Sequence, residues 1–257
     1  MSVLPHGLIQ GTVTDRIDWT DSIFSLRVTA PISTYVAGQF TKLALQSASG
    51  EWIRRAYSLV NSPNHKKGHQ EMEFLLITAA DGQLSPRLNA LIKDDCVYVG
   101  RDASGFMTLD EVPEAMKDLW LLSTGTAIGP FLAILDELET QSRFDNVVLV
   151  HAVRTQAELV YQSTIEALIA RYQGKLHYIP VVSRQKCAGI LTGRIPALLS
   201  SGELVKKAQV KLTRENSFFN VCGNPSMVQD TCKVLIQLGY RRHLRRKSGQ
   251  FSSENYW

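Results

Sequence analysis

The sequence predicts two domains, a six-stranded antiparallel β-barrel followed by a doubly wound α/β domain with a parallel sheet. In the first half, short β-rich runs are separated by Gly, Pro, Asn or Asp, and a single helical segment interrupts them. In the second half, short continuous apolar runs alternate with segments of helical periodicity, which is typical of a parallel sheet covered by helices. We place the domain boundary at residue 112, which gives domains of residues 1–112 and 113–257.

The barrel elements are predicted from runs that are rich in β-branched and aromatic residues. The six strands cover residues 8–16, 23–29, 39–45, 53–60, 73–78 and 96–99. The single helix is predicted to begin at Ser85, which acts as its N-cap and is followed by Pro86 in the first turn. Leu88, Leu91 and Ile92 continue this helix at helical spacing.

The elements of the second domain follow a regular alternation of strand and helix. The predicted buried strands are residues 119–122, 147–150, 176–182 and 218–222. The predicted helices between and after them are residues 131–138, 156–171 and 225–238. Because parallel strands end at one edge of a sheet, loops after these strands are expected to form one ligand-binding edge.

Composition limits the possible function classes. A net charge of +4 is mild and by itself gives no reason to expect nucleic-acid binding. No apolar run approaches the roughly 20 residues that a membrane span needs, and residues 1–11 lack the features of a signal peptide. The four cysteines lack the spacing of zinc or iron–sulfur ligands. We therefore expect a cytoplasmic protein, monomeric by default, with free thiols and no metal site.

A glycine-containing turn between the first strand and helix of the second domain is the first candidate for nucleotide binding. Residues 124–130 read TGTAIGP. Its glycines allow the backbone to approach a ligand closely, and the following helix N-terminus offers N–H groups to a phosphate. The turn lacks the third glycine of the dinucleotide fingerprint, so a tight strand-to-helix turn without a ligand remains an alternative.

Arginines follow two neighbouring strands at the same predicted edge. Arg154 ends the second strand, where a protein selective for NAD would carry an acidic residue. Ser183 and Arg184 end the third strand, and Arg194 follows ten residues later. Guanidinium groups suit a 2′-phosphate, so together they favour NADP(H) over NAD(H), although each alone could be a solvated surface charge.

Two further motifs are ambiguous when taken alone. Residues 55–58 of the barrel read RAYS, and an arginine two residues from a tyrosine could clamp a flavin nucleotide or form an exposed pair on an edge strand. After the fourth strand of the second domain, Cys222 precedes an Asn224-Pro225-Ser226 helix start. By spacing, Cys222 is best explained as a small buried residue at a strand end.

In combination, the motifs resemble the bacterial-type ferredoxin–NADP reductases over essentially the whole chain. The resemblance rests on residues 55–58, 81–88, 124–130, 183–184, 193–196 and 222–225 and on the terminal Tyr256-Trp257, which occur in this order. It implies an FAD-binding barrel followed by an NADP-binding domain. Leu75 stands where relatives commonly have an aromatic residue, and the basic loop of residues 64–70 is longer than usual, so contacts at the adenine end of FAD are open.

The resemblance also implies roles for individual residues. The FAD-binding residues would be Arg55, Ala56, Tyr57, Ser58, Leu75, Leu76, Ile77, Thr78, Gln83, Leu84, Ser85, Thr126, Tyr256 and Trp257. The NADP-binding residues would be Val153, Arg154, Ser183, Arg184, Arg194, Asn224, Pro225, Ser226 and Asp230. Ser58, Cys222 and Trp257 would flank the reacting rings. Glu254 is a possible proton relay, but an exposed carboxylate in the tail is the simpler expectation.

The implied reaction is hydride transfer between NADP(H) and FAD, with single electrons exchanged with a ferredoxin or flavodoxin. Such carriers are acidic, and five cations at Arg241, Arg242, Arg245, Arg246 and Lys247 are expected to form their docking surface, with a solvated tail as the alternative. Two other functions remain open, an NAD(P)H–flavin or oxygenase reductase component and a non-catalytic flavin-binding subunit. A reductase component often has a fused domain or lacks a terminal aromatic residue. A non-catalytic flavin-binding subunit would be expected to lose the arginines of the NADP site.

Overall fold

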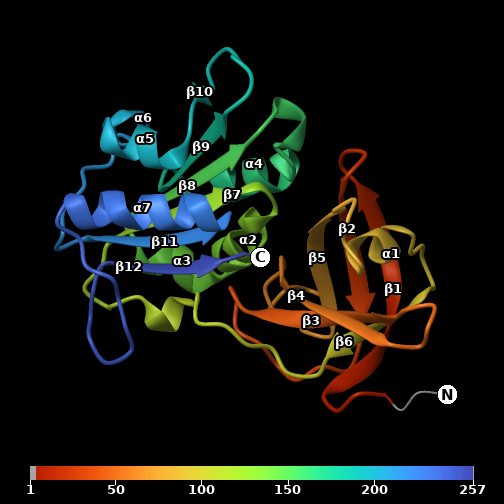
Figure 1. Cartoon of the computed structure of the whole chain (residues 1–257). Helices are drawn as coiled ribbons and strands as arrows, with labels where there is room; N and C mark the ends of the chain where they lie inside the picture. Colours follow the sequence, from red (N-terminus) through yellow and green to blue (C-terminus); the bar gives the residue numbers. More distant parts are fainter. Residues whose placement is uncertain (1–3, 257) are drawn as a thin grey trace.

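The computed structural model describes residues 4–256, which form two sheets packed side by side (Figure 1). The first sheet is antiparallel, with strand order β4-β3-β6-β1-β2-β5. Its strands are β1 (Leu8–Asp18), β2 (Ile23–Thr29), β3 (Phe40–Gln46), β4 (Trp52–Ser58), β5 (Glu71–Ile77) and β6 (Cys96–Gly100). All six strands were predicted, with bounds that differ by one or two residues at most of their ends.

The antiparallel sheet curls until its two edge strands meet. Just beyond β4, Leu59 pairs with Phe74 of β5 in an isolated antiparallel bridge. The Val60 N–H donates to the Glu73 carbonyl oxygen at 2.9 Å. These contacts join the first and last strands of the sheet order, so that Leu43, Phe74 and other apolar side chains are enclosed in a barrel core.

The second sheet is parallel throughout, with strand order β10-β9-β8-β7-β11-β12. Its strands are β7 (Asp118–Thr124), β8 (Asn146–Val153), β9 (Leu176–Val182), β10 (Leu191–Thr192), β11 (Ser217–Gly223) and β12 (Phe251–Asn255). The chain proceeds from β7 outward on one side and later returns to place β11 on the other side of β7. This reversal creates a topological switch point, beside which ligands of doubly wound folds bind.

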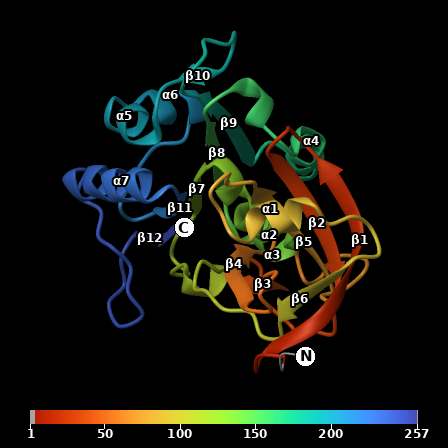
Figure 2. The same ribbon diagram turned by 45° about the vertical axis from the view of Figure 1, so that its right-hand side comes forward.

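Helices cover both faces of the parallel sheet. They are α2 (Gly129–Asp136), α3 (Leu138–Arg143), α4 (Gln162–Arg171), α5 (Ile195–Ser200), α6 (Glu203–Ala208) and α7 (Pro225–Gln237). In both views α5, α6 and α7 lie on the side of the sheet away from the barrel (Figures 1 and 2). Side chains alternate along β7, so Leu119 and Leu121 pack with α2 and α4, whereas Trp120 and Leu122 pack with α5 to α7.

One hydrophobic cluster is shared by the two domains. It contains Val60 and Leu75 of the barrel together with Phe131 of α2 and Ile165 of α4, and all four side chains are buried. Burial of apolar surface between the domains is the main force that holds them together. The ligand-binding edge of the parallel sheet is thereby held against the barrel.

Several local predictions were wrong. The barrel helix α1 (Ser85–Asn89) has Leu84 as its N-cap, makes no side-chain capping bond, and ends before Ile92, which is exposed. The predicted helix 131–138 breaks at Glu137, and Leu138 begins the separate helix α3. The predicted helix 156–171 is a 3₁₀ turn, η3 (Gln156–Glu158), followed by α4, because Tyr161 has a left-handed backbone with φ of 60°.

Elements without a strong periodic signal were missed. These are the short strand β10, the helices α5 and α6, the 3₁₀ turns η1 (Leu109–Glu111) and η2 (Gly125–Ile128), and the edge strand β12. The four cysteines are free thiols, with Cys222 and Cys232 buried. Within residues 4–256, no helix combines the length and the apolar character that a bilayer-spanning segment requires, and no group of acidic, histidine or cysteine side chains there could hold a metal ion.

Candidate functional site

A cavity of about 390 Å³ lies at the carboxyl edge of the parallel sheet. Eight predicted NADP-binding residues line it, namely Val153, Arg154, Ser183, Arg184, Arg194, Asn224, Ser226 and Asp230. Pro225 is the first residue of α7 and lines a separate groove with Cys232 and Arg242. The volume lies within the range that small-molecule sites occupy.

The three cavity arginines are exposed and come from three different connections. Arg154 follows β8, Arg184 follows β9, and Arg194 precedes α5. Backbone bonds hold the first two side by side, since the Arg184 N–H donates to the Arg154 carbonyl oxygen at 2.9 Å. Ser183 is fixed in the same way, because its hydroxyl donates to the Val153 carbonyl oxygen at 3.1 Å. The edge therefore presents three permanent positive charges, which suits a phosphate-bearing ligand.

The other side of the cavity is built where β7 and β11 end next to each other. Asn224 caps α7, and its side-chain oxygen accepts from the N–H groups of Ser226 and Met227. Its own N–H donates to the Thr124 hydroxyl at 3.0 Å. A Cβ atom on Gly223, which has φ of +145°, would lie only 2.0 Å from that hydroxyl oxygen. A glycine is therefore required for the two strand ends to approach so closely.

Among the side chains of this site that were not predicted from the sequence, two are polar and have defined hydrogen bonds, Glu158 and His151. Glu158 lines the cavity and accepts a hydrogen bond from the Thr155 hydroxyl at 3.1 Å. The Thr-x-x-Glu spacing of a capping box is the signal that could have identified this turn. His151 is fully buried behind the cavity, and no spacing rule points to it.

His151 supports the Gly125 turn from inside the sheet. Its Nε2 lies 3.1 Å from the Gly125 carbonyl oxygen, which can only accept, so this nitrogen carries the proton. Burial lowers the pKa of His151 to about 4, and the bond to Gly125 offsets only part of that effect. The imidazole is therefore neutral at physiological pH and acts as a hydrogen-bond donor to the turn.

A second cluster lies between the barrel and the end of the chain. Ser58, the last residue of β4, is buried and lies close enough to Tyr256 to influence the pKa of its hydroxyl. The Tyr256 N–H donates to the Gly223 carbonyl oxygen at 3.0 Å, which places this residue next to Cys222. Burial raises the pKa of Tyr256 and also that of Cys222, so both groups keep their protons at neutral pH.

Glu254 belongs to this cluster, and the expectation of an exposed tail carboxylate is wrong. Strand β12 places Glu254 opposite Cys222 in the parallel register. The carboxylate of Glu254 accepts from the Phe106 N–H at 3.2 Å, and burial raises its pKa. No local pattern predicts strand β12, so the position of Glu254 beside Cys222 could not be predicted from the sequence. Trp257, predicted to cover the flavin, lies outside the described residues.

The remaining predicted flavin residues lie along the barrel rim. Arg55 and Ala56 are exposed and Tyr57 is half-buried on β4. Burial raises the pKa of Tyr57, and the charge of Arg55, which lies two residues away on the same strand, opposes this. On β5, Leu75 and Leu76 are buried, one in each hydrophobic cluster that flanks the strand.

The rim residues fit a large, partly apolar ligand. Ile77 ends β5 with 38% of its surface exposed, and the next hydroxyl, Thr78 Oγ1, is buried without a hydrogen-bond partner among residues 4–256. An unpaired buried hydroxyl normally indicates a further partner. Leu84 and Ser85 are buried at the start of α1 and Gln83 is exposed. The Ser85 hydroxyl accepts from the Ala79 N–H at 3.0 Å and retains its own proton for donation.

The turn after β7 connects the two clusters. Thr126 is buried in η2, which leads directly into α2. A Cβ atom on Gly129 would lie 3.1 Å from a methyl group of Val60 and 4.0 Å from the Tyr256 hydroxyl oxygen. Four features therefore follow one another across the interface between the domains. They are the nucleotide cavity, the turn after β7, the cluster of Ser58, Cys222, Glu254 and Tyr256, and the barrel rim. This arrangement can bring a nucleotide on the parallel sheet against a second ligand on the barrel.

Comparison with known proteins agrees with this arrangement. Residues 121–233 match the oxidoreductase NAD-binding domain family. The flavodoxin/ferredoxin–NADP reductases of Shigella flexneri and Escherichia coli (strain K12) are each 49% identical over 250 residues, which is 97% of this chain and 98% of theirs. A crystal structure of a ferredoxin NADP⁺ reductase from Neisseria gonorrhoeae with bound FAD and NADP superposes with a TM-score of 0.90. It has 31% sequence identity and covers 98% of this chain and 100% of that one. The chain belongs to the flavodoxin/ferredoxin–NADP reductase family.

Proposed function

We propose that this enzyme transfers hydride between NADP(H) and FAD, and single electrons between FAD and a ferredoxin or flavodoxin. The main support for the proposal is that two sites, the arginine-rich cavity and the barrel rim, lie next to each other at the interface between the domains. The relatives that are 49% identical are named for the same reaction. We further propose that residues 1–112 form the FAD domain and residues 113–257 the NADP domain.

In this proposal, Arg184 and Arg194 hold the 2′-phosphate of NADP(H), with Ser183 beside them and Arg154 nearby. Each guanidinium offers several fixed donors to the phosphate and stays charged at every physiological pH. Asn224, Ser226 and Asp230 contact the nucleotide from the α7 side of the cavity. Arg154 directly follows β8, at the position where an NAD-selective fold carries the acidic residue that accepts from the ribose 2′-hydroxyl.

On the barrel side, Arg55 binds the FAD pyrophosphate and Tyr57 lies against the ring system. Leu75 to Thr78 flank the ring along β5, while Leu84 and Ser85 meet a phosphate. FAD held by these residues would supply the hydride and single-electron chemistry of the reaction. Ser58 and Cys222 lie beside the reacting rings, where their neutral O–H and S–H groups orient the nicotinamide and exclude water. Trp257 is proposed, from sequence resemblance alone, to cover the ring.

The docking surface for an acidic carrier is proposed to be the basic hairpin, defined as residues 241–247. Leu244 and Lys247 pair across its tip. Arg242 donates to Ser253 Oγ at 2.5 Å, and Arg245 pairs with Glu111 at 3.2 Å, so these two cations have structural partners. Arg241, Arg246 and Lys247 are exposed and form no ion pair within residues 4–256.

The basic hairpin is connected to the proposed reaction centre by short contacts. The guanidinium carbon of Arg245 lies 4.1 Å from the centre of the Phe106 ring. The Phe106 N–H donates to Glu254, which lies opposite Cys222. A carrier that is drawn to these charges would therefore dock close to the site of electron transfer, and its on-rate would depend on electrostatics.

The test is to purify the protein and mix it with each nucleotide in the absence of oxygen. We expect a yellow protein with bound FAD that is bleached rapidly by NADPH and far more slowly by NADH. Adding an oxidised ferredoxin or flavodoxin should restore the yellow colour. A yellow protein that neither nucleotide bleaches would indicate a non-catalytic flavin-binding subunit instead. Equal bleaching by both nucleotides, with transfer only to free flavin or a dye, would indicate the other reductase class.

A further inference from the structure

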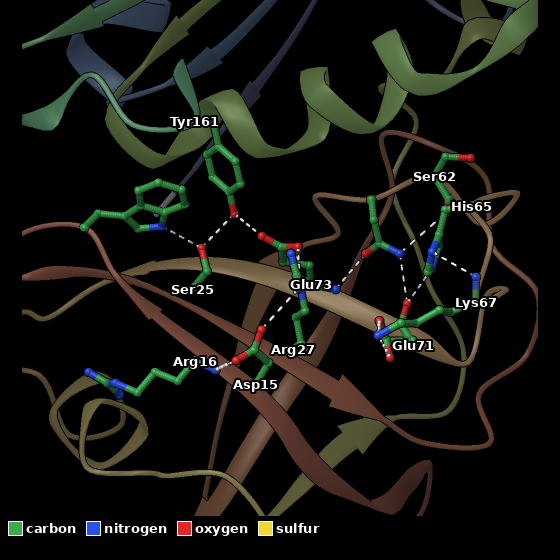
Figure 3. A network of polar contacts seen from close by, with 12 residues as sticks. Asp15, Arg16, Ser25, Arg27, Ser62, His65, Lys67, Glu71, Glu73 and Tyr161 are labelled. Carbon is green, nitrogen blue, oxygen red and sulfur yellow. Dashed lines mark hydrogen bonds and ion pairs between the residues drawn. The ribbon is translucent and has the colours of Figure 1, made fainter. Parts of the chain in front are cut away.

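A chain of hydrogen bonds crosses from the barrel to the second domain beside the proposed site (Figure 3). The Tyr161 hydroxyl, just before α4, donates to Glu73 Oε1 of β5 at 2.5 Å. The same hydroxyl oxygen lies 2.7 Å from Ser25 Oγ of β2. Ser25 in turn accepts from Trp19 Nε1 at 2.8 Å, and Glu73 Oε2 accepts from Arg27 Nε at 2.9 Å.

The direction of every bond in this chain is determined. A carboxylate can only accept, so the proton between Tyr161 and Glu73 belongs to the tyrosine. Burial raises the pKa of Tyr161 well above its usual value, and the charge of Glu73 raises it further, which keeps the phenol protonated. The Ser25 hydroxyl must then donate to the Tyr161 oxygen while it accepts from Trp19.

The crossing point is buried. Ser25 has 0%, Tyr161 5% and Glu73 8% of its surface exposed. The Tyr161 ring packs on Trp19 with their centres 4.6 Å apart. Buried polar groups that lose one partner cost more than exposed ones, because water cannot replace the lost bond. The hydrogen bonds of Tyr161 to Glu73 and Ser25 therefore favour one arrangement of the two domains at this point.

The backbone conformation of Tyr161 explains why its side-chain bonds determine the position of residues 154–161. Its φ of 60° places it in the left-handed region, which a bulky residue rarely adopts without outside restraint. This conformation ends the segment 154–161 and allows α4 to begin, since the Tyr161 carbonyl oxygen accepts from the Ile165 N–H at 2.9 Å. Its side chain is restrained by residues of the other domain, through its bonds to Glu73 and Ser25 and its packing on Trp19.

The two ends of the link lead to the two proposed ligand sites. Upstream of Tyr161, the segment 154–161 carries Arg154 and Glu158, which line the nucleotide cavity. Downstream of Glu73, β5 continues through Leu75 to Ile77, the segment proposed to flank the flavin. The link therefore connects a segment that lines the nucleotide cavity with the strand proposed to flank the flavin.

Resting on the proposed function, we propose that Tyr161 is a positioning residue for hydride transfer. Its hydroxyl fixes segment 154–161 of the NADP domain relative to β5 of the FAD domain. The nicotinamide then meets the flavin ring at the distance that hydride transfer needs. Misplacement of reacting atoms by about 1 Å can slow a reaction by about a hundredfold, so a loosened link should affect the rate more than the affinity.

The test compares Tyr161→Phe with Tyr172→Phe. Tyr172 is equally buried, and its hydroxyl donates to the Leu135 carbonyl oxygen at 2.8 Å, so that this bond lies entirely within the second domain. Flavin reduction is followed by stopped flow at saturating NADPH, and hydrogen–deuterium exchange is measured on residues 154–165 of each holoenzyme without nucleotide. Thermal unfolding and FAD content are measured for both variants.

We expect Tyr161→Phe to keep its FAD. Its flavin should be reduced at least about tenfold more slowly than in the wild type at saturating NADPH, and the amide hydrogens of residues 154–165 should exchange faster. Tyr172→Phe should also lose thermal stability but keep the wild-type reduction rate and the wild-type exchange in that segment. If Tyr161→Phe does not accumulate, Ser25→Ala removes the donor behind Tyr161 and should slow reduction in the same direction, by less.

Two results would overturn the proposal. One is a wild-type reduction rate in Tyr161→Phe, or in Ser25→Ala where that variant is used. The other is equal slowing in Tyr161→Phe and Tyr172→Phe, because that would make the effect one of general stability. Failure of the proposed function is distinguishable, since the wild-type protein itself would then not be reduced by NADPH.

Discussion

The Asn224 N–H donates to the Thr124 hydroxyl at 3.0 Å, although the two residues are 100 positions apart in the sequence. This bond joins the ends of β11 and β7 at the switch point of the parallel sheet. Gly223 makes the approach possible, because any side chain there would collide with the Thr124 hydroxyl. The shape of the nucleotide cavity at this end therefore depends on one glycine.

Gly223→Ala should destabilise the protein and weaken NADP⁺ binding together. Alanine is disfavoured at φ of +145°, and its Cβ would lie 2.0 Å from Thr124 Oγ1. We expect a loss of roughly 1–3 kcal/mol in the free energy of unfolding from backbone strain, and more from the collision. Gly174→Ala is the control, since its φ of +90° imposes backbone strain but no atom lies within 4 Å. Urea unfolding measures the stability of each variant, and titration measures its NADP⁺ affinity. Equal losses in Gly223→Ala and Gly174→Ala would show that the collision with Thr124 does not matter.

Arg184→Ala and Arg194→Ala should each weaken NADPH binding far more than NADH binding. Each removes a charged contact to the 2′-phosphate, which should cost roughly 1.5–3 kcal/mol, or about tenfold or more in affinity. NADH lacks that phosphate, so its KM should change little. The exposed Lys186→Ala, which removes a charge nearby but outside the cavity, serves as the control. Equal losses for both nucleotides would remove these arginines from the 2′-phosphate site.

His151 should make the folded protein less stable as the pH falls. Its pKa is lowered from 6.5 to about 4 on folding, so between these values the unfolded chain binds a proton that the folded protein does not. Stability is then fully present above pH 6.5 and decreases toward pH 4, by at most about 3 kcal/mol.

The variant His151→Gln should show a flatter pH dependence of unfolding than the wild type over that range. Its amide N–H can still donate to Gly125, but it has no group that titrates there. Exposed His6→Gln is the control and should follow the wild-type curve. Urea unfolding at several pH values measures the difference. Parallel curves for the wild type and His151→Gln would show that His151 is not the titrating group.

Neutralising the free charges of the basic hairpin should slow reduction of an acidic carrier. Arg241, Arg246 and Lys247 are changed to Gln together, because Arg242 and Arg245 also have structural partners. At low ionic strength we expect a loss of about tenfold in the on-rate and a weaker dependence on salt. Oxidation of NADPH by a small neutral quinone should not change.

The matched control for this prediction is a triple change to Gln at Lys206, Lys207 and Lys211, which are exposed on and after α6. It removes the same charge at a distant surface, and it should leave carrier reduction nearly unchanged. Stopped-flow measurements across ionic strength compare the two variants. Equal slowing by both variants would mean that net charge, rather than the basic hairpin, guides the carrier.

A variant that ends at Tyr256 should keep FAD but bind NADP⁺ more tightly. If Trp257 covers the flavin as the sequence resemblance implies, its ring must move before nicotinamide can stack there, and that displacement reduces the apparent affinity. Titration with NADP⁺, followed by the flavin absorption spectrum, measures the change. Unchanged affinity together with an unchanged spectrum would exclude Trp257 from the flavin.

Much of the architecture could be predicted from local patterns. Strand β9 covers residues 176–182 as predicted, and α7 ends one residue earlier than expected. Hydrophobic periodicity records which side chains each segment buries, and turns record where the chain reverses. The order of the strands then places their ends at one edge, which is why Arg154, Ser183 and Arg184 were expected together and line one cavity.

The tertiary structure alone decided the features that depend on distant partners. Tyr161 interrupts a segment of continuous helical periodicity, and its hydroxyl is bonded to Glu73, 88 residues away. Glu254 lies beside Cys222 because β12 adds to the sheet edge, where few side chains carry a strand pattern. His151 is neutral because of burial behind Gly125. Local sequence encodes backbone preference and burial, whereas these positions are determined by contacts between segments that meet only after folding.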